Sequence, residues 1–137
     1  MISTVLARSL RDIGLEWHPV SGDAFRIDRE EFESEVFTVS DMTVEVHEFD
    51  TGTILGFNGT TEWALDSVAI EDSLWLPRED QLRKLLGAGF RALVKLDGDA
   101  GYRVDILAHG DPRSFTVEQP ADAYAMALEF LLRLTFE

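Results

Sequence analysis

The sequence predicts an α+β fold, in which an antiparallel sheet has its helices mainly on one face. In several short segments apolar and polar residues alternate with the period of a β-strand, and turns containing Gly and Asp separate these segments. Other segments have apolar residues at helical spacing, together with residues typical of helix ends. Because the connections between the strand segments are short, we expect neighbouring strands to pair antiparallel.

Helical patterns occur along the whole chain. The predicted helices are 3–13, 62–69, 77–86 and 120–135. The first has a cap at Ser3 or Thr4, and Gly14 can adopt the left-handed conformation at its end. We expect Pro77 at the first position of its helix. The helix that begins at Pro120 is apolar on almost every side, which predicts burial against the sheet and a second layer.

Strand patterns lie between these helices. The predicted strands are 25–28, 35–40, 43–49, 53–57, 90–96, 102–108 and a last one marked by Phe115 and Val117. The apolar residues 74–76 are interpreted as a connector that leads into the helix after Pro77.

The length of 137 residues suits a single domain, 1–137. The order helix, about three strands, helix occurs twice, in the halves 1–72 and 73–137. The segment GDAFRID at 22–28 also resembles GDAGYRVD at 98–105. One interpretation is a duplicated α-β-β-β-α unit. The other is convergence, because Gly-Asp turns followed by aromatic strands are common.

Acidic residues dominate the charge. The formal net charge is −14, and residues 1–72 contain 4 basic and 16 acidic residues, a net charge of −12. Such a surface repels a phosphate backbone, so the composition disfavours nucleic-acid binding. Two interpretations of the acidic half stay open, namely a general contribution to solubility and a surface for a basic partner.

Several classes of protein are disfavoured by what the sequence lacks. There is no cysteine, and therefore no disulfide, thiol nucleophile or Cys-ligated zinc. No apolar run approaches the roughly 18 residues that span a bilayer, and the N-terminus lacks the pattern of a signal peptide. We therefore expect a cytoplasmic protein that does not bind membranes.

Residues with catalytic potential are few. The three histidines, His18, His47 and His109, are not at a metal-ligand spacing, and no phosphate loop, nucleophile elbow or dinucleotide motif is present. We therefore predict no catalytic residue, no metal and no cofactor. Arg–x–Asp pairs occur at 26–28 and 103–105, for which ordinary pairing within the sheet is the simpler interpretation and a ligand-binding fork the other.

A group of aromatic and polar residues near the centre of the chain is the candidate binding site. Aromatic side chains are enriched both in cores and at interfaces. The predicted binding residues are Phe57, Asn58, Thr60, Thr61, Trp63, Trp75 and Arg78. The alternative interpretation places these aromatic side chains in the core.

Three segments carry a resemblance to known proteins. FNGTTEWALDSV at 57–68, LWLPREDQLRKLLG at 74–87 and AYAMALEFLL at 123–132 together resemble a family of small uncharacterised bacterial proteins of actinobacterial type. The order of elements is similar to that of type III secretion chaperones and sensory-regulator-like proteins. That resemblance implies binding to a partner protein, often as a homodimer.

We therefore expect a non-catalytic, acidic protein-interaction module that acts as an adaptor, chaperone or regulator. Its partner would be a protein, basic in the sharper interpretation of the charge, or a second copy of the chain in a homodimer. The alternative is a small-molecule-binding protein or an enzyme, with its site near His47 and Asn58.

Overall fold

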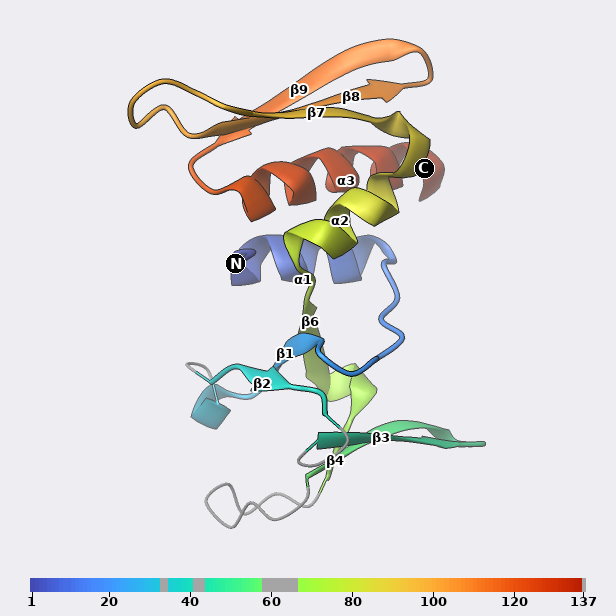
Figure 1. The fold of residues 1–137 in the computed structure, drawn as a ribbon. Helices are drawn as coiled ribbons and strands as arrows, with labels where there is room; N and C mark the ends of the chain where they lie inside the picture. The colour runs from blue at the N-terminus through green and yellow to red at the C-terminus, as the bar shows by residue number, and fades with distance from the viewer. Residues whose placement is uncertain (33–34, 41–43, 58–66, 137) are drawn as a thin grey trace. The chain divides into compact units, whose positions relative to one another are not determined.

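The structure is a computed structural model that describes residues 1–32, 35–40, 44–57 and 67–136. It confirms the α+β class, because these residues form three α-helices and three antiparallel sheets of three strands each. The chain divides into two compact units (Figure 1). Unit 1 consists of Met1–Glu16 and Pro77–Glu137, and unit 2 is Trp17–Leu76.

Unit 1 contains all three described α-helices and one sheet with the strand order β7-β8-β9. Its elements are α1 (Thr4–Ile13), α2 (Glu79–Leu86), a short 3₁₀ helix (Gly87–Gly89), β7 (Phe90–Lys95), β8 (Tyr102–Ala108), β9 (Asp111–Val117) and α3 (Pro120–Phe136). Figure 1 shows α3 as a middle layer, with the sheet on one side and α1 and α2 on the other. The prediction that this helix is buried by a sheet and a second layer is therefore confirmed.

Small side chains allow α3 to be covered on both sides. Its four alanines at 121, 123, 125 and 127 are each at most 1% exposed. Two hydrogen bonds join α3 to α1: Ser3 N donates to Asp122 Oδ1 over 2.7 Å, and Ser9 Oγ donates to Glu129 Oε2 over 2.8 Å. The polar residues of α3 thus bind the neighbouring helix, while its alanines permit close packing.

The ends of the helices follow local chemistry. The prediction for the first helix is confirmed, because the Ser3 side chain accepts from Leu6 N and Gly14 ends α1 with φ of 129°. The prediction for Pro77 is wrong. Arg78 is the N-cap of α2, and its backbone N–H donates to Gln81 Oε1 over 2.9 Å, so that Pro77 precedes the helix. The side chain of Gln81 satisfies the backbone donor that a later helix start exposes.

Unit 2 contains two small sheets, with the strand orders β2-β1-β6 and β3-β4-β5. Its strands are β1 (Ala24–Ile27), β2 (Phe37–Thr38), β3 (Val44–Phe49), β4 (Gly52–Phe57), β5 (Ser67–Ala69) and β6 (Ser73–Leu76), and its 3₁₀ helices are Glu30–Phe32 and Ile70–Asp72. Both sheets contribute to one core, made of Phe25, Ile27, Phe32, Phe37, Val39, Val44, Leu55, Phe57 and Val68. Aromatic rings are therefore prominent in this core of unit 2. In unit 1, by contrast, the buried residues of α3 are mainly alanines.

Two sequence predictions in unit 2 are wrong. Residues 67–69 of the predicted helix 62–69 form β5, in which Val68 pairs with Leu55, while 62–66 lie outside the described residues. Residues 74–76 are not a connector but belong to β6, which pairs with β1. An isolated helix of two turns is marginal in water, and pairing with β4 buries the β-branched side chain of Val68 instead. Of the predicted strand 35–40, only Phe37–Thr38 forms β2.

The two sequence halves differ in their strand pairing. Each contains a three-stranded meander, β3-β4-β5 and β7-β8-β9, but β6 from the second half pairs with β1 from the first. The boundaries between the compact units also lie at 16–17 and 76–77 instead of 72–73. The single domain and the duplication both stay predictions.

Candidate functional site

The seven predicted binding residues do not all lie in the described part of the chain. Asn58, Thr60, Thr61 and Trp63 are outside the described residues. Phe57 and Trp75 belong to unit 2, and Arg78 belongs to unit 1.

Phe57 and Trp75 are packed against other aromatic side chains of unit 2. The Phe57 ring is 5.4 Å from Phe37 and 6.4 Å from Phe25, centroid to centroid, and Phe57 is only 7% exposed. The Trp75 indole is nearly parallel to that of Trp17, with centroids 6.4 Å apart. Packing in the core accounts for Phe57, and Trp75 is half-buried against Trp17. A role of either residue in binding stays a prediction.

Arg78 is exposed at the start of α2. Its Nε lies 3.1 Å from Asp80 Oδ1, and this contact holds the pKa of the Asp80 carboxyl below its usual value. Arg78 is thus engaged with its own helix, in a geometry that solvent screens.

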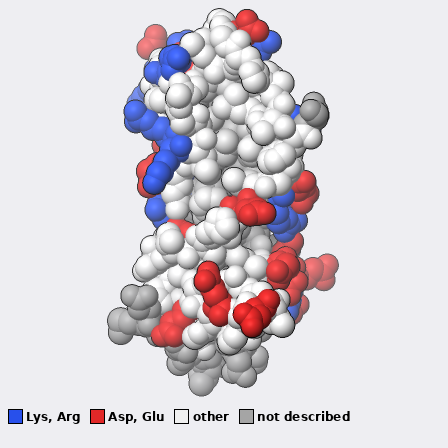
Figure 2. Space-filling model, turned by 90° about the vertical axis from the view of Figure 1, so that its right-hand side faces the viewer, with Lys and Arg blue, Asp and Glu red and all other residues white. Residues whose placement is uncertain are grey.

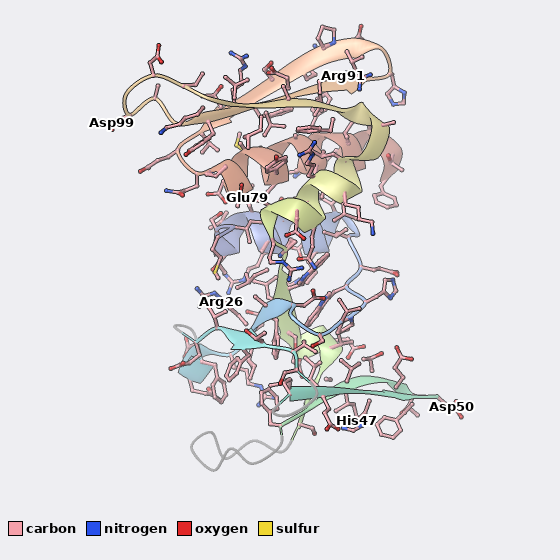
Figure 3. All side chains as sticks on the ribbon, in the orientation of Figure 1. Arg26, His47, Asp50, Glu79, Arg91 and Asp99 are labelled. Atoms are coloured by element: carbon pink, nitrogen blue, oxygen red, sulfur yellow. The ribbon has the colours of Figure 1, made fainter. Side chains whose placement is uncertain are left out.

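His47 projects from β3 (Figure 3). Because side chains alternate along a strand, it lies on the face of the sheet opposite Val46 and Leu55. Its Nε2 is 3.7 Å from Glu45 Oε2, and its ring stacks on Phe49 with centroids 6.4 Å apart. A Cβ at Gly56 would approach the imidazole to 3.0 Å, so the ring lies directly over that glycine. About half of the His47 side chain is exposed.

The second Arg–x–Asp pair is an ion pair on the sheet of unit 1. Arg103 Nε and Nη2 donate to the two carboxylate oxygens of Asp105 over 2.8 and 3.2 Å, and Ser114 Oγ donates over 2.7 Å. The bonds from Arg103 and then Ser114 lower the pKa of the Asp105 carboxyl. In the first pair, Arg26 is half-buried in β1 and Asp28 is exposed beyond its end.

The net charge of the chain resides almost entirely in unit 2. The sequence of unit 2 has 14 acidic and 2 basic residues, a net charge of −12, whereas unit 1 has 12 acidic and 10 basic residues, a net charge of −2. Exposed carboxylates of unit 2 belong to Asp28, Glu30, Glu31, Glu48, Asp50, Glu71 and Asp72. Figure 2 shows acidic side chains of unit 2 gathered with few basic ones among them. Arg29 lies 3.8 Å from Asp72, which offsets only one of these charges.

A shallow groove of about 330 Å³ lies beside β3 in unit 2. Its lining combines the nearly buried side chains of Val39 and Val44, which are 3% and 4% exposed, with polar groups, and the carboxylate of Glu45 adds a negative charge. The groove is lined by Pro19, Val20, Ser21, Val39, Ser40, Val44, Glu45 and Val46. His47 is not among the residues that line it, and Asn58, the other residue of the alternative site, lies outside the described residues.

The sequence does not reveal this groove. It predicts the strand 43–49 but not which neighbours the strand has, because strand order depends on contacts between distant segments. The segment 19–21 that forms one wall has no recognisable motif. The available signal is the alternation of Val44 and Val46 with the acidic Glu45, which predicts a strand but not a groove beside it.

No three His, Asp or Glu side chains within the described ranges come together as a group that could hold a metal ion. None of the described helices is both long enough and apolar enough to span a bilayer.

Comparisons with protein-family models, with curated proteins and with solved structures gave no match.

Proposed function

We propose that the protein is a cytoplasmic, non-catalytic interaction module, acting as an adaptor, chaperone or regulator, that binds a basic partner protein through unit 2. The observation that carries this proposal is the unequal charge of the two units, −12 in unit 2 against −2 in unit 1.

Solubility alone does not explain why the charge is concentrated. A net charge of −14 would keep the chain soluble wherever its carboxylates lay. Crowding like charges into one unit of 60 residues with only 2 basic residues instead destabilises that unit through self-repulsion. A single-sign surface does, however, accelerate the approach of an oppositely charged partner and disfavours other partners.

The proposal is tested by capturing partners from a native lysate of the source organism on the immobilised full chain. Two variants, each less acidic by four charges, are compared with the natural chain. The unit 2 amide variant carries Glu30→Gln, Glu31→Gln, Glu48→Gln and Glu71→Gln, all at exposed positions. The unit 1 amide variant carries Asp97→Asn, Asp99→Asn, Asp111→Asn and Glu118→Gln, also at exposed positions.

We expect the natural chain and the unit 1 amide variant to retain the same basic protein, and the unit 2 amide variant to lose most of it. Equal retention by both variants would contradict the proposal. Light scattering on the purified chain determines whether it forms a homodimer. A strict monomer that captures no partner would also contradict the proposal.

A further inference from the structure

β3 is an edge strand of its sheet, as far as the described residues show, and it lacks several features that protect such edges, namely a bulge, a proline and a lysine. Its six residues pair with β4 in continuous register, without a bulge, and include no lysine or proline. Exposed strand edges of this kind are ready templates for pairing with another chain.

The other edge strands are protected or short. In unit 1, β7 has a register shift between Phe90 and Ala92 and ends in Lys95, and β9 contains Pro112. In unit 2, the edge strands β2, β5 and β6 have two, three and four residues. β3 therefore differs from every other edge strand in the described ranges.

The backbone groups of Val46 and Glu48 face away from β4. Val44 O accepts a hydrogen bond from Ser40 N over 2.9 Å, outside the ladder between β3 and β4. Because an antiparallel ladder alternates, the N–H and C=O groups of Val46 and Glu48 point to the same outer edge as those of Val44. They are positioned to pair with an added strand.

Side chains near this edge specify what kind of strand fits. The groove beside Val44–Val46 has valine side chains in its lining and room for a small apolar side chain beside them. Glu45, Glu48 and Asp50 on β3 and its turn provide negative charge. A second copy of this chain would bring another strand with two glutamates and no lysine or arginine, so the charge disfavours pairing of β3 with itself.

We infer that the edge of β3 is a docking site for an extended, basic segment of the partner, which adds to the sheet as a further strand. The segment alternates small apolar residues with lysine or arginine. The apolar residues enter the groove beside Val44 and Val46, and the basic residues lie on the other face of the sheet, where they meet Glu45. The backbone pairs with Val46 and Glu48. This inference rests on the proposed function and specifies its partner and its mode of binding.

The test uses the full chain and a synthetic peptide of about eight residues in which lysine and valine alternate, a length typical of strands. One control peptide has proline in place of valine, which retains the charge but removes backbone donors. The other has glutamate in place of lysine. Amide hydrogen exchange is followed by NMR. We expect the Lys–Val peptide to protect the amides of Val46 and Glu48, and to change those of Glu45 and His47 little, since these already pair with β4.

The matching protein variant is Val46→Pro, which removes an outward N–H and leaves the donors of Glu45 and His47 in the ladder. We expect this variant and the proline peptide each to weaken binding by about tenfold or more.

If Val46→Pro does not fold, the comparison of the peptides still decides the question. Equal binding of the proline and Lys–Val peptides, or no protection of Val46 and Glu48, would overturn the inference. Loss of the captured partner only in the unit 2 amide variant would then still support the proposed function.

Discussion

The two units of this chain are built and charged differently. Unit 1 has one sheet covered by α3, with α1 and α2 beyond it, and its 10 basic and 12 acidic residues nearly balance. Unit 2 has two small sheets around an aromatic core and a net charge of −12. The difference indicates that unit 1 is organised by close packing around α3, whereas unit 2 carries the charge and the open edge suited to recognition.

The sequence supplies a separate optical probe for each unit. All three tryptophans, at 17, 63 and 75, fall in the range of unit 2, and both tyrosines, at 102 and 124, fall in that of unit 1. Tryptophan fluorescence therefore follows the unfolding of unit 2. NMR signals of the tyrosines follow unit 1.

The largest effect is expected from Phe25→Ala in unit 2. Phe25 is fully buried, with ring centroids 5.4 Å from Trp17 and 5.6 Å from Phe37. Its loss leaves a cavity and should lower the free energy of unfolding of unit 2 by about 3–5 kcal/mol, measured by tryptophan fluorescence in urea. Phe49→Ala is the control, because Phe49 is 58% exposed and should cost little. Equal effects of the two substitutions would contradict the aromatic core.

Asp23→Ala should destabilise unit 2 by about 1–3 kcal/mol, because it leaves buried donors unsatisfied. The Asp23 carboxylate is 1% exposed and accepts from Trp17 Nε1 over 2.9 Å and from Val20 N over 3.1 Å. Asp23→Asn keeps an acceptor oxygen and should cost less. An asparagine variant as unstable as the alanine variant in the same urea titration would show that the charge matters and not the acceptor.

In unit 1 the contrasting substitution adds volume. Ala125 is fully buried in α3, so Ala125→Leu should overpack the helix layer and lower the free energy of unfolding of unit 1 by about 1–3 kcal/mol. Met126→Leu, at a half-buried position of the same helix, conserves volume and is the control. The tyrosine NMR signals measure the unfolding of unit 1 in both variants. A neutral Ala125→Leu would mean that α3 is not tightly covered.

The smallest effect concerns the pH dependence of unit 1. The pKa of Asp105 is lowered in the folded state, so its contribution to stability is present above the unfolded pKa of about 3.9 and is lost as the pH falls through the folded value. Asp105→Asn should cost about 0.5–1 kcal/mol at pH 7, since the pair is partly exposed, and the difference from the natural chain should vanish in acid. A difference independent of pH would contradict this assignment, and Asp99→Asn in an exposed turn is the control.

Local chemistry made unit 1 the more predictable part. Ser3, Gly14 and the continuous apolar character after Pro120 are readable without knowledge of the fold, and the structure confirms what they predict. In unit 2, Val68 and Trp75 belong to strands whose partners are distant in sequence, Leu55 and Phe25. The local pattern around Val68 also suits a short helix, and that around Trp75 also suits a connector. Only the pairing with a distant strand makes these segments β-strands.

The acidic character of the candidate site could be predicted from the sequence, but its location in the fold could not. The acidic first half is visible from composition, and it corresponds closely to unit 2. The edge of β3 is not visible, because a strand at an edge and a strand at the centre of a sheet can have the same alternation. That β3 has no bulge, proline or lysine is relevant only at the edge of a sheet, and the strand order that places it there is not readable from the sequence.

The most direct test of the account measures how salt affects binding of the captured partner. Its Kd is determined for the natural chain and both amide variants between about 0.05 and 0.5 M NaCl, a range over which surface charges become screened. We predict that log Kd rises steeply with log salt for the natural chain and the unit 1 amide variant, and clearly less steeply for the unit 2 amide variant. The same slope for both variants would contradict the claim that unit 2 carries the binding surface.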